Sequence, residues 1–97
     1  MKKTFELTHP KIKFARMVES TKHDVKKYLK RERNKALPED ADYWDFDCKI
    51  GKTEQTADVI HVSAISQEID TILTEDNTSF YLEILARPAV RSFEEKE

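Results

Sequence analysis

The chain has little of several residues that proteins use for special purposes. It contains one glycine, three prolines, one cysteine and one tryptophan in 97 residues. A single glycine, Gly51, excludes a glycine-rich phosphate-binding loop, and so few Gly and Pro residues favour regular elements joined by short connections. The lone Cys48 cannot form an internal disulfide, so we expect a reducing compartment.

Long apolar runs are missing as well. No stretch approaches the ~18 apolar residues that cross a bilayer, and the N-terminal lysines are not followed by the apolar segment of a signal peptide. We therefore expect a cytoplasmic protein without membrane contact. At 97 residues and 38% hydrophobic content, we predict a single compact domain over 1–90 and a flexible acidic tail over 91–97.

Charge is abundant and unevenly distributed. Residues 1–35 carry twelve Lys and Arg against four Asp and Glu, a net +8, whereas residues 36–97 carry five against fifteen, a net −10. The formal total of −2 hides this polarity. Either the basic half contacts an acidic partner, or the two halves neutralise each other.

Alternating hydrophobicity predicts four strands. The clearest covers 43–50, where every second residue is apolar, and the others cover 3–8, 57–62 and 79–86. Pro88 is expected to end the last strand. The residues predicted to face inward are Phe5, Leu7, Trp44, Phe46, Cys48, Ile50, Ile60, Val62, Phe80, Leu82 and Ile84.

A helical period predicts two helices between these strands. The first covers 10–34 and begins at Pro10 after Thr8 or His9 as cap; its apolar stripe is Phe14, Met17, Val18, Thr21, Val25, Tyr28 and Leu29. The second follows Ser63 as cap, with the stripe Ile65, Ile69, Ile72 and Leu73. The first helix would measure ~37 Å against ~20–27 Å for a strand, so its last turns should overhang the sheet.

The element order β-α-β-β-α-β predicts an α+β fold of ferredoxin-like topology. This plan is a four-stranded antiparallel sheet with both helices on one face, and the first and third strands at its centre.

Four segments, MKKTFELTHPKIK, KKYLKRERNKALPE, YWDFDCKIG and SFYLEILARP, resemble a family of small bacterial proteins known as a domain of unknown function. The resemblance covers residues 1–90. It implies a bacterial, cytosolic, compact domain of about 100 residues, and it transfers no catalytic or binding residue.

The exposed side of the first helix is the leading candidate site. Its cations are Lys22, Lys26, Lys27, Lys30, Arg31, Arg33 and Lys35. Such a row can displace counterions from a nucleic-acid backbone, so we hypothesise contact with a polyanion such as structured RNA. Two alternatives stay open: the cations pair with acids of the second helix, among them Glu68, Asp70, Glu75 and Asp76, or they form a solvated face.

A second binding hypothesis is protein–protein or self-association, with the basic helix on an acidic patch of another chain. A lower-ranked one is a small-ligand or metal site on the open sheet face, made by Asp45, Asp47 and His61. Phosphate is disfavoured on that face because Glu6, Asp45, Asp47 and Glu83 would repel it.

No catalytic constellation emerges from the sequence. Cys48 should point inward as a core residue, His9 should act as a local cap, and His23 lies among lysines. We therefore predict a binding or accessory protein that is not an enzyme and has no cofactor.

Overall fold

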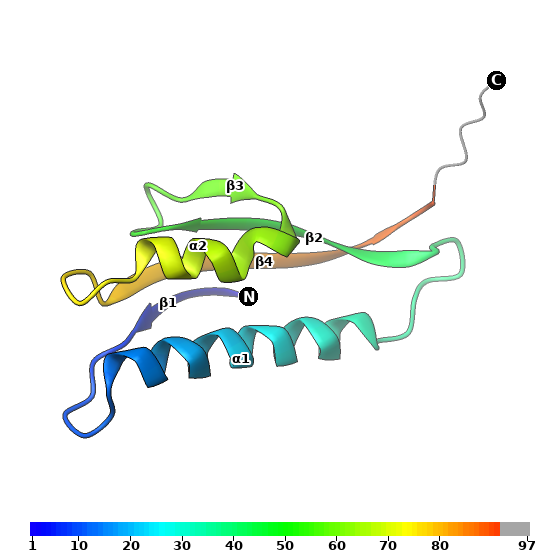
Figure 1. Cartoon of the computed structure of the whole chain (residues 1–97). Coiled ribbons are helices and arrows are strands. Elements are labelled where there is room, and N and C mark those ends of the chain that lie inside the picture. Colours follow the sequence, from blue (N-terminus) through cyan, green and yellow to red (C-terminus); the bar gives the residue numbers. More distant parts are fainter. Residues whose placement is uncertain (92–97) are drawn as a thin grey trace.

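The computed structural model describes residues 1–91 and contains the predicted succession of strands and helices (Figure 1). The elements are β1 (Lys2–Glu6), α1 (Phe14–Arg33), β2 (Tyr43–Gly51), β3 (Asp58–Ile60), the short 3₁₀ helix η1 (Val62–Ala64), α2 (Ile65–Ile72) and β4 (Ser79–Ala89). Within the described residues, no helix is both long and apolar enough to cross a membrane. The predicted acidic tail begins at Arg91, and its residues 92–97 lie outside the described part of the chain.

The four strands form one antiparallel sheet, which confirms the predicted α+β class. Their order is β1-β4-β2-β3, so β4 and β2 are central and β1 and β3 are the edges. The ferredoxin-like expectation placed the first and third strands at the centre, and that topology is not confirmed. Alternation along a strand fixes which face each side chain takes but not which strand lies beside it, and the long β4 pairs with β1 on one side and β2 on the other.

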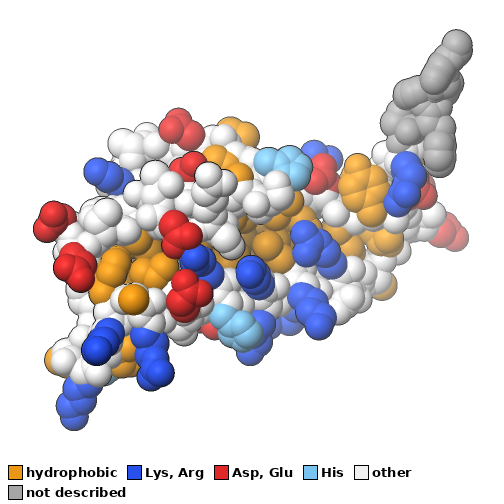
Figure 2. All heavy atoms as spheres, in the orientation of Figure 1, with side chains coloured by type: hydrophobic (Ala, Val, Ile, Leu, Met, Phe, Trp, Pro, Cys, Tyr) orange, Lys and Arg blue, Asp and Glu red, His pale blue; other side chains and the backbone are white. Residues whose placement is uncertain are grey.

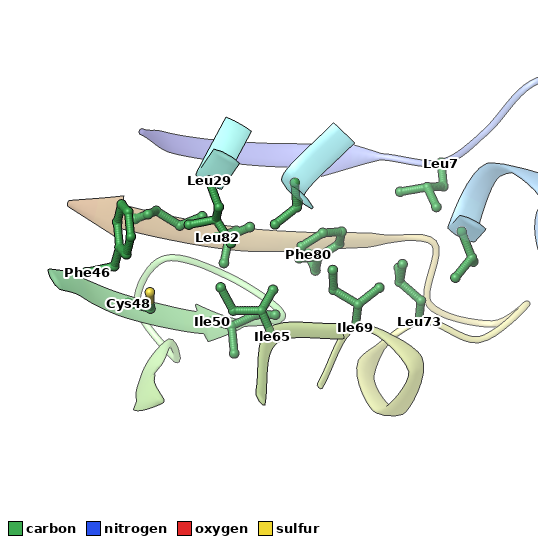
Figure 3. Packing of buried hydrophobic residues seen from close by; sticks show 13 residues of the cluster. Leu7, Leu29, Phe46, Cys48, Ile50, Ile65, Ile69, Leu73, Phe80 and Leu82 are labelled. Carbon is green, nitrogen blue, oxygen red and sulfur yellow. The ribbon is translucent and has the colours of Figure 1, made fainter. Parts of the chain in front are cut away.

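Both helices pack on the same face of the sheet. The buried cluster joins Val18, Val25 and Leu29 of α1, Ile65 and Ile69 of α2, and the inward side chains of β2 and β4 (Figure 3). Its most deeply buried large side chains are Phe80, Ile69, Leu82, Ile84 and Cys48. The predicted inward faces of β2 and β4 are therefore confirmed. Truncation of such a side chain to alanine would cost about 2–5 kcal/mol.

Helix α1 begins later than predicted and does not overhang the sheet. It starts at Phe14, and in the turn that precedes it His9 accepts a hydrogen bond from the backbone N–H of Lys11 at 3.1 Å. Its 20 residues span about 30 Å. The 11 residues of β4 span about 37 Å. The expectation of an overhang was wrong because β2 and β4 continue beneath the end of α1.

Strand β4 passes through Pro88, where the sequence had predicted its end. Backbone groups of alternate residues in a strand point to the same side. The N–H of Ile84 points toward the β1 side, where it donates to the Met1 carbonyl at 2.8 Å. Pro88 has the same parity, and β1 pairs only with residues up to Glu83. The missing N–H of Pro88 therefore removes no bond to β2.

Strand β3 is shorter than predicted, and this moves His61. The strand ends at Ile60, and His61 caps η1 instead, its Nδ1 accepting from the backbone N–H of Ser63 at 3.1 Å. The cap thus lies two residues before the predicted cap at Ser63, and the helical segment begins at Val62, first as η1 and then as α2.

Candidate functional site

The candidate site is the basic face of α1, defined as Lys22, Lys26, Lys27, Lys30, Arg31, Arg33 and Lys35. The sequence places it there because Val18, Thr21, Val25 and Leu29 are buried against the sheet and α2, which turns the opposite arc to solvent. Figure 2 shows cationic side chains along this side of the molecule, next to an apolar area. Three of these cations, Lys30, Arg31 and Arg33, lie in the last turn of α1. Their positive charge there also complements the negative end of the helix dipole.

Two of the seven cations are neutralised by acids of the same chain. Lys22 donates to Asp70 of α2 at 2.8 Å and lies 3.5 Å from Glu19. The hydrogen bond that Lys22 donates to Asp70 raises the pKa of Lys22. Lys35 lies 2.9 Å from Glu32. The prediction that cations pair with the second helix therefore holds at Asp70, and both lysines are held in place by partners before any ligand arrives.

Two arginines lie over aromatic rings. The Arg33 guanidinium is 5.3 Å from the centroid of the Phe46 ring, and Arg31 is 5.8 Å from that of Tyr28. Such contacts orient the guanidinium without neutralising its charge. Both side chains remain exposed and keep their donors for an anion.

Lys26, Lys27 and Lys30 are exposed and form no ion pair with any residue of 1–91. Lys27 and Lys30 also line a shallow surface hollow of about 430 Å³ together with Arg31 and Asn34. All four lining side chains carry N–H donors. The arrangement suits a phosphate or another compact anion at the end of α1.

The sequence reasoning missed Asn34, although a signal for it was present. The four lining residues occupy positions 27, 30, 31 and 34. This i, i+3, i+4, i+7 spacing places side chains on one face of a helix. Asn34 is uncharged, so the pattern of charges did not single it out.

The open sheet face does not bring the suggested metal ligands together. Asp45 and Asp47 share the outward face as predicted, but Arg87 bridges them: its Nη2 donates to Asp45 and its Nε to Asp47, each at 2.9 Å. These carboxylates raise the pKa of Arg87. His61 lies off the strand, bonded to Ser63. Within residues 1–91, no group of three or more His, Cys, Asp or Glu side chains could hold a metal ion.

Arg87 escaped the sequence analysis because the last strand was predicted to end at Ala86. Extending the alternation by one residue places Arg87 on the outward face, opposite Asp45 in the observed register. Tyr81 lies on that face as well but is only 4% exposed. Burial, followed by its hydrogen bond to Glu83, raises the pKa of Tyr81 to about 12.

Cys48 lies in the core, as predicted, and is 2% exposed. Burial, and then the charges of Asp47 and Asp45, raise the pKa of its thiol to about 11. A neutral, buried thiol is a poor nucleophile. His23, by contrast, is exposed on α1.

Comparison with known proteins identifies the family but not its activity. The chain belongs to a family of unknown function, DUF6172, which matches residues 1–95. This match confirms, over nearly the whole chain, the resemblance to a family of unknown function. No curated protein and no solved structure matches it.

Proposed function

We propose that this protein binds a polyanion, the phosphate backbone of a nucleic acid, through the basic face of α1. The observation that carries this proposal is the division among its cations. Lys22 and Lys35 are paired with acids, whereas Lys26, Lys27 and Lys30 stay exposed and in no ion pair within residues 1–91. Helix α1 packs on the sheet through Val18, Val25 and Leu29, so the backbone positions that carry these three lysines keep a fixed spacing.

Binding of phosphate to this protein would depend on the local positive charge of α1 and not on the net charge of the protein. The formal charge is −2, so long-range attraction to a nucleic acid is weak and contact depends on local charge. Arg31 adds a planar group that can bond phosphate bidentately. Four cations in contact would give a log–log dependence of affinity on salt with a slope of about −3 to −4.

The test is a fluorescence anisotropy titration with labelled RNA and duplex DNA over a series of salt concentrations. The combined change Lys26→Glu, Lys27→Glu and Lys30→Glu should abolish binding at low salt. A matched control reverses the exposed cations Lys2, Lys49 and Lys52, which lie away from α1. It alters net charge equally and should lower the affinity far less. Equal losses in both variants would contradict a local site.

A second candidate is association of two copies through opposite charges. Exposed acids such as Glu39 and Asp40 follow α1, so a second molecule could place them on its lysines. Sedimentation in the absence of nucleic acid distinguishes the two proposals. A mass that doubles at low salt and halves at high salt supports association; a constant monomer mass excludes it.

A further inference from the structure

Trp44, the only tryptophan of the chain, has a position that core packing alone does not explain. It lies at the start of β2, packs against the edge of the buried cluster and remains partly exposed. Its indole Nε1–H donates to the Lys35 backbone carbonyl at 3.0 Å. This bond fixes the ring directly beside the last residue of the basic face.

The end of the molecule that carries Trp44 has fewer covering elements than the rest of the helix face. Figure 1 shows that α2 lies over the other part of the sheet, while α1 runs on toward the start of β2. There Arg33 covers the ring of Phe46, two positions from Trp44 on the same face. Aromatic and cationic groups therefore adjoin each other at this end.

The basic face leads directly to the indole. From Lys27 to Arg33, the last residue of α1, the helix advances about 9 Å at ~1.5 Å per residue, and Lys35 follows two residues later. The hollow of Lys27, Lys30, Arg31 and Asn34 lies within this stretch. Lys35 follows this stretch, and its backbone carbonyl accepts the hydrogen bond of the Trp44 indole.

We infer that the polyanion is a single-stranded nucleic acid and that one of its bases stacks on Trp44; this inference rests on the proposed function. Bases within a duplex are already stacked and paired, so a surface indole beside a cationic helix has no free base to receive. A single strand supplies unstacked bases, and any base can stack because every base has a π-face. The phosphates lie along α1 and the base lies on the indole.

The experiment titrates the wild-type protein at low salt with oligothymidylate and, separately, with a blunt duplex of the same length. Fluorescence of Trp44 should be quenched by the single strand but not by the duplex, and salt should restore it. This measurement needs no variant, so it does not depend on whether a substitution at Trp44 folds.

Variants then test the contact itself with a labelled oligothymidylate. Trp44→Leu should weaken binding roughly 5- to 100-fold, the range for loss of one stacked base, whereas Trp44→Phe should retain most of the affinity. Tyr43→Leu is the matched control, because Tyr43 is 39% exposed and points to the opposite face of the same strand. Thermal unfolding of each variant confirms that it is folded.

The outcomes separate the two proposals. Salt-sensitive binding of both nucleic acids with equal affinity and unchanged fluorescence would overturn the single-strand inference while leaving polyanion binding intact. Absence of binding to either at low salt would overturn both.

Discussion

Replacement of Gly51 by alanine tests how closely the backbone of the turn between β2 and β3 approaches this residue. Gly51 is the only glycine, and its backbone φ is not positive, so conformational freedom is not the reason for it. The reason is space. A Cβ at this position would lie 2.7 Å from the Cα of Ala57 and 2.9 Å from the carbonyl oxygen of Thr56. Both are backbone atoms, so the turn itself would have to move.

The expected effect follows from two opposing terms. Overpacking of this kind costs about 1–3 kcal/mol. The loss of glycine's freedom in the unfolded chain returns about 0.4–1 kcal/mol. With the middle value of each range, the net destabilisation is about 1.3 kcal/mol. For a domain of this size the melting temperature should fall by roughly 5–10 °C.

Thermal denaturation followed by circular dichroism measures this change, with Gln55→Ala in the same exposed turn as control. A second readout is Tyr81, which pairs with Gly51 in the sheet. Displacement of the turn should admit water and lower the pKa of Tyr81 from about 12 toward its ordinary value. A Gly51→Ala protein that melts at or above the wild-type temperature would refute the steric argument.

Three further outcomes are expected. The thiol of Cys48, with its pKa raised to about 11 chiefly by burial, should not react with a disulfide reagent at pH 8 until the protein is denatured. Burial and the bond to Glu83 raise the pKa of Tyr81 in the folded state. The unfolded chain therefore loses the phenolic proton at a lower pH than the folded chain. The free energy of unfolding should fall between about pH 10 and 12, and it should fall less in Tyr81→Phe. Asp70→Asn should lower stability by about 0.2–1 kcal/mol at low salt and by less at high salt, and a cycle with Lys22→Met isolates the pair.

Much of the fold could be predicted because it depends on local periodicity. Alternation over 43–50 identified β2 and its buried face, and Phe46 and Cys48 are both buried. The stripe through Val18, Val25 and Leu29 identified the buried side of α1 and, by subtraction, its basic face. The boundaries were less accurate where a local hydrogen bond competed, as at His9 and His61.

The sequence predicted the candidate site as a set of cations, but it did not show which of them are paired with acids. Lys22 has the local partner Glu19 three residues before it, but its shorter contact, at 2.8 Å, is with Asp70. Asp70 lies 48 positions away from Lys22 in the chain, so the lysines of this arc could not be told apart by this contact from the sequence. In the same way, Asp45 and Asp47 suggested a metal site until Arg87 was seen between them, 42 and 40 positions away.

The sequence by itself determined the inward faces of β2 and β4, the cationic side of α1 and the α+β class, because these depend on periods of two and 3.6 residues within single elements. Only the tertiary structure decided that β4 and β2 are central, that Lys22 is neutralised while Lys26 is not, and that Trp44 lies beside Lys35. These outcomes depend on contacts between distant segments, whose pairing is chosen by the packing of the whole chain.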